Sequence, residues 1–281
     1  MYELRFPAAD LAPFIESYWF VHGPGPVDLR VDVFVDGRAD LILNFGAPYL
    51  REVIGGKTRE VRRSNLDAQR LEPIRIIQRG RVRTTGVRFR LGGLAPFARR
   101  PLGPLTGRTP APQAVLGPAA RALEADLRET PDLDGQARLL DGFFLRLLSG
   151  APDLGAFRRA LDAAAASGGA ANLQALARAA RTSPRQVERL FARHLGIPPR
   201  ALGRVLRFQT ALRALMTDPG CTLGEVAVRA GYFDQAHFIK DFKRLSGGVP
   251  RGYKGYFPPQ GPRDFAPNVV VFLQERERGA G

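Results

Sequence analysis

Two stretches in the last third of the chain carry polar side chains whose types suit contact with nucleic acid. In each stretch, apolar residues recur at helical spacing and leave the opposite side of the helix to charged and amide groups. The outward-facing residues are Arg185, Glu188, Arg189 and Arg193 in the first stretch, and Gln235, Ala236, Lys240 and Lys243 in the second, with Ile239 near the same face. Arginine pairs well with guanine, glutamine with adenine, and alanine can touch the methyl group of thymine. These residues are the candidate DNA contacts.

The two stretches belong to an internal repeat of a short helix, a tight turn and a second helix. Apolar positions of the first copy recur at an offset of 50 residues before the turn and 51 after it, for example Ala180 with Ala230 and Phe191 with Phe242. Side chains that cap helices open the helices of both copies, and they are Asn172, Ser183, Thr222 and Asp234. Gly231 stands where the second turn requires positive φ. The pattern predicts two helix-turn-helix units, joined by an amphipathic helix over residues 199–217.

The distribution of charge supports a polyanionic partner. The whole chain of 281 residues has a formal net charge of +15 and a pI near 11.0, which is typical of proteins that bind nucleic acid or an anionic membrane surface. Residues 172–257 hold 15 basic and 5 acidic residues, a net charge of +10. A basic helical bundle can also be purely structural, but the repeat and the clustered charge argue against that alternative. A second basic segment, residues 57–90 with 11 basic and 3 acidic residues, could bind an anionic effector, lie along DNA or form a solvated strand face.

Residues 172–257 resemble the DNA-binding region of AraC/XylS-type bacterial transcription regulators. Residues 225–227, 230–238, 242–244 and 248–254 carry the resemblance, and the sequence departs from the family pattern at Phe233, Lys240 and Val249. The resemblance implies a sequence-specific transcription regulator that binds double-stranded DNA. By resemblance, the base-facing residues are Arg185, Glu188, Arg189, Gln235, Ala236 and Lys240. His237 is expected to pack rather than to contact phosphate.

The first hundred or so residues are expected to be β-rich. Segments 31–36, 41–45, 74–77 and 81–90 show alternating or buried-strand patterns, which favour an antiparallel sandwich or barrel. Segments 35–46 and 86–93 resemble the N-terminal domain of one branch of these regulators, and this implies a cupin-like domain. A barrel could enclose an effector among Trp19, Phe34, Leu43 and Phe45, although ordinary core is the commoner role for such residues.

The expected fold class is therefore α+β: a β-rich domain over 1–112, a helical connector over 113–169, an all-α double helix-turn-helix domain over 170–257, and a tail over 258–281. The connector should contain helices over 119–130, 135–148 and 154–166. Gly168 and Gly169 are predicted to form a flexible joint between domains. A short strand is expected at residues 269–273.

Other functional classes find less support. The single cysteine, Cys221, excludes an intramolecular disulfide and a cysteine-based zinc site. We expect no cofactor and no metal. We also expect no membrane association and a cytoplasmic location, because no long apolar stretch or signal peptide is visible. The alternatives are a nonspecific architectural DNA-binding protein, or an enzyme with Cys221 as nucleophile and the helices as a docking module. The resemblance also brings in a small-molecule effector, RNA polymerase and a second copy of the chain as candidate partners.

Overall fold

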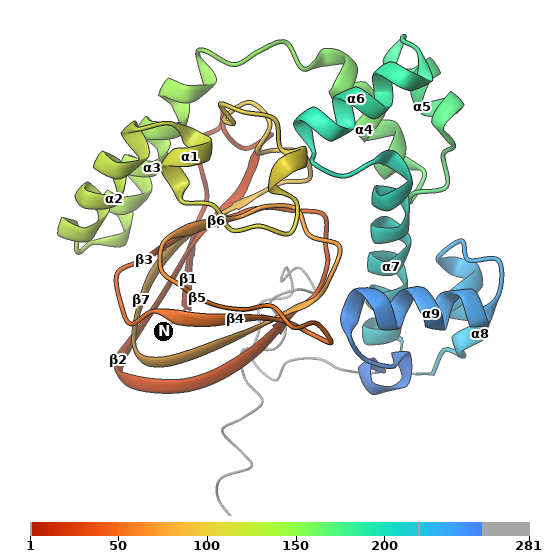
Figure 1. Cartoon of the computed structure of the whole chain (residues 1–281), viewed down its shortest axis with the longest axis horizontal. Coiled ribbons are helices and arrows are strands. Elements are labelled where there is room, and N and C mark those ends of the chain that lie inside the picture. The colour runs from red at the N-terminus through yellow and green to blue at the C-terminus, as the bar shows by residue number, and fades with distance from the viewer. Residues whose placement is uncertain (1, 219, 255–281) are drawn as a thin grey trace, which may run out of the picture.

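The computed structural model describes residues 2–218 and 220–254, with a β-rich part followed by helices (Figure 1). Its strands are β1 (Tyr2–Arg5), β2 (Ile15–Val33), β3 (Asp40–Asn44), β4 (Tyr49–Val53), β5 (Arg59–Arg62), β6 (Asn65–Asp67) and β7 (Ile74–Phe89). Its α-helices are α1 (Pro112–Leu116), α2 (Ala119–Glu129), α3 (Leu133–Leu148), α4 (Gly155–Ala166), α5 (Leu173–Ala180), α6 (Pro184–His194), α7 (Pro199–Thr217), α8 (Leu223–Arg229) and α9 (Gln235–Ser246). Two 3₁₀ turns lie at Gly103–Leu105 and Pro250–Tyr253. The α+β fold expected from the sequence is confirmed.

The long strands β2 and β7 organise the antiparallel sheet. They pair along most of their length, and the strand order is β1-β2-β7-β3-β6. The first part of β7, Ile74–Gln78, pairs with β4, whereas its last part, Thr84–Arg88, pairs with β3. The β4–β5 hairpin and the β3–β6 pair are therefore attached to different parts of the same strand, and the sheet curls between them (Figure 1).

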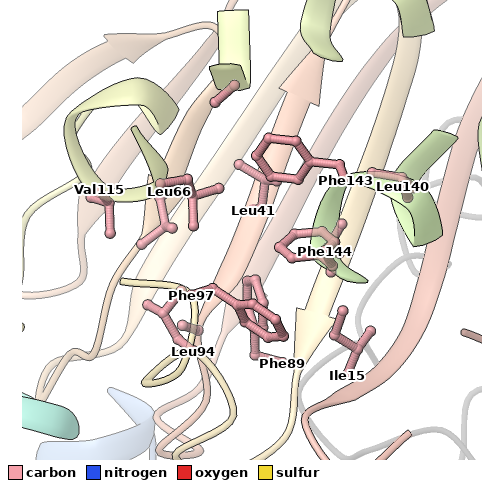
Figure 2. Close-up of a cluster of buried hydrophobic side chains, with 14 of the residues drawn as sticks. Ile15, Leu41, Leu66, Phe89, Leu94, Phe97, Val115, Leu140, Phe143 and Phe144 are labelled. Carbon is pink, nitrogen blue, oxygen red and sulfur yellow. The ribbon is translucent and has the colours of Figure 1, made fainter. Parts of the chain in front are cut away.

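The two faces of the sheet have different roles because side chains alternate along each strand. One face packs against α1–α3 and holds a core that includes Tyr18, Phe20, Leu41, Leu43 and Phe89. Figure 2 shows Phe89, Phe97 and Phe144 meeting in this core, where the Phe97 and Phe144 ring centroids lie 4.9 Å apart. Neighbouring residues of the same strands point to the opposite face, which lines a cavity.

The strand predictions hold in part. The predicted strands over 74–77 and 81–90 form one continuous strand, β7, which passes through Gly80 at a φ of 88°. The strand predicted over 31–36 ends at Val33, because Phe34 and Val35 leave the sheet and enter a helical core. Strands β1, β4, β5 and β6 and the first half of β2 were not predicted. These strands are short or polar at their edges, and their alternation is weak.

The helical part is built around α7, whose observed bounds are those predicted. Its first half shares a core with α4, α5 and α6, and its second half shares one with α8 and α9. Figure 1 accordingly shows the two helix-turn-helix units at opposite ends of α7. Both units are confirmed as predicted.

The glycine pair before α5 differs from the flexible joint expected. Gly169 donates from its N–H to the Ala164 carbonyl at 3.0 Å, and its own carbonyl accepts from the Arg207 guanidinium at 3.0 Å. Its backbone lies so close to Gly203 of α7 that a side chain at either position would collide. The pair is a packed turn, and α4 on its far side contributes Phe157 and Leu161 to the core of the first unit. These contacts favour a division before α4, and the boundary at residue 170 stays a prediction.

The predicted tail over 258–281, including the strand over 269–273, lies outside the described residues. Among residues 2–218 and 220–254, no helix has the length and apolar character needed to cross a bilayer.

Candidate nucleic-acid interface

Helix α6 is held by a cap and an apolar stripe that leave one side free. The Ser183 hydroxyl accepts from the Gln186 N–H at 3.2 Å, and Pro184 occupies the first turn. Val187 and Phe191 are fully buried against α4, α5 and α7. The four predicted DNA contacts of this helix are all exposed, and they are Arg185, Glu188, Arg189 and Arg193.

Helix α9 repeats the arrangement in the second unit. The Asp234 carboxylate accepts from the His237 N–H at 2.7 Å and caps the helix, while Phe238 and Phe242 are fully buried. The predicted contacts are again exposed, and they are Gln235, Ala236, Lys240 and Lys243. Ile239 was expected near the outer face, but it is half-buried and packs against the core of this unit.

The charged and amide side chains of this interface are not bonded to other groups of the described protein. Within the described ranges, none of the seven polar side chains among these predicted contacts forms a hydrogen bond or an ion pair. The basic segment over 57–90 behaves differently. Arg59 pairs with Glu52 at 2.9 Å, Arg62 with Glu60 at 2.5 Å, and Arg75 with Asp32 at 2.6 Å. Much of the positive charge of that segment is compensated internally, whereas that of α6 and α9 is available to a partner.

Each turn before a second helix contains one residue in the left-handed region. Arg181 has φ 54° and Gly231 has φ 73°, both in the left-handed region. In the second unit, the Thr222 side chain and the Glu225 carboxylate form the predicted reciprocal capping box. Hydrogen bonds from the Thr222 N–H and hydroxyl lower the pKa of Glu225, so the box is present at neutral pH. The caps predicted from the sequence therefore fix where each exposed helix begins.

Two other candidate residues, His237 and Cys221, contact neighbouring parts of the protein. His237 is exposed, with its ring edge-on to Tyr232 at 5.3 Å and its Nε2 3.6 Å from the Asp241 carboxylate. Cys221 is buried beside α7, and its thiol lies 3.9 Å from the Ala214 carbonyl, which does not fit a nucleophile open to substrate. The part of the chain that the structure describes contains no cluster of three or more metal-ligating side chains.

A loop of the β-rich part is inserted into the second helix-turn-helix unit. Phe34 and Val35 are buried among residues of α7, α8 and α9, and the Phe34 ring meets Tyr253 at 5.3 Å. The Val35 carbonyl accepts from the Gln209 side chain at 2.6 Å, and the Val35 N–H donates to the Leu245 carbonyl at 3.4 Å. The β-rich part thus contacts α7 and the end of α9 directly.

The open face of the sheet encloses a cavity of about 170 Å³. Of the four residues predicted to line an effector pocket, Trp19 lies in the wall of this cavity and the other three do not. Leu43 and Phe45 lie on the face of the sheet that packs against α1–α3. Phe34 lies beyond the end of β2, in the helical core. The prediction is therefore wrong for Phe34, Leu43 and Phe45.

Sequence reasoning missed the charged lining of this cavity. Arg51, Arg70 and Arg88 face it, together with Asp40 and Asp67. Alternation along residues 49–53 places Arg51 on the same face as Tyr49, and this was the available signal. Arg88 of β7 pairs with Asp40 of β3, which is 48 residues away, so spacing in the sequence does not reveal that ion pair. Arg70 pairs with Asp67, only three residues away.

Known domain families match both the β-rich part and the helical part of the chain. Residues 176–255 match a family of helix-turn-helix domains, and residues 4–110 match a domain family of unknown function, DUF6597. The HTH-type transcriptional regulator GlxA of Rhizobium meliloti (strain 1021) is 38% identical over 76 residues, which are 27% of this chain and 23% of GlxA. The match thus spans about a quarter of that relative.

Two solved structures are also similar. ToxT from Vibrio cholerae aligns over 83% of this chain and 97% of its own, with a TM-score of 0.46 and 10% identity. The C-terminal domain of AraT, a response regulator from Geobacillus stearothermophilus, aligns over 35% of this chain and 83% of its own, with a TM-score of 0.33 and 28% identity. The helix-turn-helix family match, over residues 176–255, falls on the paired helix-turn-helix units described above. The region that resembles AraC/XylS-type regulators in sequence thus belongs to a helix-turn-helix domain family, and part of the chain is similar to an HTH-type transcriptional regulator.

Proposed function

We propose that the protein is a sequence-specific DNA-binding transcription regulator whose β-rich part binds a small effector. The observation that carries the proposal is the pair of exposed, capped helices, α6 and α9, at the two ends of α7. Their outward side chains include arginine, lysine and glutamine without partners inside the described chain. A helix of this kind fits the major groove, where such side chains distinguish base pairs.

The length of α7 suits simultaneous binding. Its 19 residues correspond to about 28 Å at 1.5 Å per residue. Successive major grooves on one face of the duplex are roughly 34 Å apart. Because the cores at both ends include residues of α7, the helix would set the spacing between α6 and α9 on DNA.

Effector control would act through the loop after β2. Phe34 and Val35 connect the cavity-bearing sheet to α7 and α9 by packing and by two hydrogen bonds. A ligand that changes the position of this loop would change the setting of the second unit. RNA polymerase and a second copy of the chain remain candidate partners, predicted from the resemblance alone.

Selection of bound sequences from a random DNA duplex pool tests the proposal. We expect an enriched site with two short elements about one helical turn apart. The full-length chain with Arg185→Ala and Arg189→Ala should lose enrichment of one element only. If the wild-type protein binds DNA from the pool without enriching any sequence, it is a nonspecific architectural protein instead.

A further inference from the structure

The cavity behind the sheet combines apolar walls with a buried arginine that has almost no partner. Apolar side chains from β2, β3 and β7, such as Trp19, Val31, Ile42 and Ile76, form most of its wall. Arg51 of β4 also lines it and is only 2% exposed. A buried charge normally requires close ion pairs and hydrogen bonds, so this arginine needs an explanation.

The contacts of Arg51 do not satisfy it. Its guanidinium lies 3.6 Å from the Asp67 carboxylate, which is beyond hydrogen-bond distance. Within the described residues it donates no hydrogen bond, and its Nε is buried without a partner. A guanidinium carries five N–H donors. The guanidinium of Arg51 thus has unpaired donors, and the side chain lines the cavity.

The other two arginines of the lining form hydrogen bonds through their terminal guanidinium nitrogens, although the Nε of each, like that of Arg51, is buried without a partner. Arg70 donates to Asp67 at 2.8 Å and to the Phe34 carbonyl at 2.9 Å. Arg88 donates to Asp40 at 2.9 Å and to Asp36. The two aspartates that face the cavity thus each have a closer arginine, although Asp67 Oδ1 also lacks a hydrogen bond. Among the charged groups of the lining, Arg51 is the cation left for a ligand.

We infer that this cavity binds a small monocarboxylic acid, with its carboxylate on Arg51 and an apolar body against Trp19. Arginine binds a carboxylate through two parallel hydrogen bonds, a geometry that fits its planar fork. An apolar cavity of about 150 Å³ holds a benzene molecule, so the volume of about 170 Å³ here suits an aromatic ring or a short branched chain. The inference deepens the proposed function by naming the chemistry of its effector.

The ligand site is linked to the helices by three successive contacts. Asp67, the neighbour of Arg51, accepts from Arg70, and Arg70 holds the carbonyl of Phe34. Phe34 in turn packs against Tyr253 and the α7–α9 core. A carboxylate that draws Arg51 away from Asp67 would alter the charge balance that positions Arg70 and the loop.

The single tryptophan of the chain, Trp19, gives a direct readout because it lines the cavity. We would titrate the full-length protein with benzoate, phenylacetate and hexanoate, and with benzamide and benzyl alcohol as neutral analogues. We expect saturable changes in fluorescence with the acids, confirmed by calorimetry, and weaker binding of the neutral analogues. Absence of binding by all three acids, or equal binding of benzoate and benzamide, would overturn the inference.

Arg51→Gln is the decisive variant, with exposed Arg59→Gln on the adjacent strand β5 as its control. Loss of charge-assisted hydrogen bonds should weaken benzoate binding about 10- to 100-fold in Arg51→Gln, while benzyl alcohol binding and Arg59→Gln stay near wild type. A purely structural Arg51 would instead give a lower unfolding midpoint and unchanged benzoate affinity. If Arg51→Gln does not fold, Arg51→Lys keeps the charge without the fork and should still favour benzoate over benzamide, but less strongly. Equal affinity for the two compounds in that variant would again contradict the inference.

Ligand binding and DNA binding are measured separately. Benzoate binding that depends on Arg51, in a protein that fails to select a DNA site, would refute the proposed function but support the ligand site. Site-specific DNA binding without any binding of the acids would support the proposed function but refute the ligand site.

Discussion

Arg181 and Gly231 occupy equivalent positions in the two repeats, and both have positive φ, 54° and 73° respectively. The backbone contacts match as well. The N–H of the residue after Arg181 donates to the Ala177 carbonyl at 3.0 Å, and that after Gly231 donates to the Ala227 carbonyl at 2.9 Å. The left-handed conformation is unfavourable for residues with a Cβ and free of that penalty for glycine. The first unit therefore adopts the left-handed conformation at this position with a less suitable residue than the second unit.

Arg181→Gly should stabilise the protein. Arg181 is exposed, so little packing is lost, and relief of the left-handed penalty should exceed the extra chain entropy by up to about 1 kcal/mol. Denaturant unfolding of the full-length variant measures the gain. Gly231→Ala is the matched control and should lose about 1 kcal/mol. A loss of stability in Arg181→Gly would mean that its side chain makes a compensating contribution.

Readout by α6 can be separated from electrostatic attraction. Arg189→Ala or Arg185→Ala should cost about 1 to 3 kcal/mol on the selected site and relax preference at one base pair. Folding should hardly change, because both side chains are exposed. Arg138→Ala on α3, also exposed, is the control. Equal losses on selected and random duplex would leave α6 with a positioning role only.

Lys240→Ala should behave as a phosphate contact. An ammonium is a point charge without the planar fork of arginine. We expect a similar loss of affinity on all sequences and a salt slope lower by about one. Binding titrations of the variant at several salt concentrations, on the selected site and on random duplex, measure both quantities. A change in base preference at one position would instead show that Lys240 contacts a base.

The overall salt dependence should be steep. If the basic helical region contacts about 6 to 10 phosphates, affinity should fall about 10³- to 10⁵-fold between roughly 50 and 200 mM salt. Fluorescence anisotropy with a labelled duplex measures this directly. Binding that barely changes over the range would refute the electrostatic argument.

The glycine turn predicts how fragments behave. A fragment that begins at residue 170 lacks Phe157 and Leu161 of α4, which are buried in the first unit. Each such side chain contributes about 1.5 to 3 kcal/mol on burial, so this fragment should be less stable than one beginning at residue 152 by about 3 to 6 kcal/mol. Circular dichroism during urea unfolding compares them. Equal stability would support the boundary at residue 170.

His194 predicts a pH dependence of folding. Burial, with a smaller effect from Arg193, lowers the pKa of His194 below its ordinary value. The unfolded chain therefore binds its proton more readily, and this contribution to stability is complete above the ordinary pKa of 6.5 and is lost as the pH falls below it. His194→Gln should reduce the loss of stability on acidification. Urea unfolding at a series of pH values tests this.

The sequence was most informative where the pattern repeats. Apolar spacing and caps at Ser183, Thr222 and Asp234 predicted the helix-turn-helix units and α7, because those signals are local. The residues that line the cavity were harder to predict, since they depend on which strands pair. Leu43 and Ile42 are equally apolar, and only the pairing of β3 with β7 shows that Ile42 faces the cavity. The insertion of Phe34 into the helical core is likewise a contact between distant segments, without a local signature.

The insertion of Phe34 and Val35 into the helical core also bears on how such regulators can be recombined. A chimera that joins the helices of this chain to another sensor domain would leave an unfilled hollow between α7 and α9, together with a Gln209 amide deprived of its acceptor. Such a chimera would fold stably only if the new sensor domain supplied apolar side chains that fill the same space. The sensor and the second DNA-binding unit are therefore expected to evolve as a matched pair. The first unit is held to the N-terminal part by different contacts, because the Leu102 N–H donates to the Arg193 carbonyl at 2.8 Å and the Thr106 hydroxyl donates to the Gly196 carbonyl at 2.6 Å.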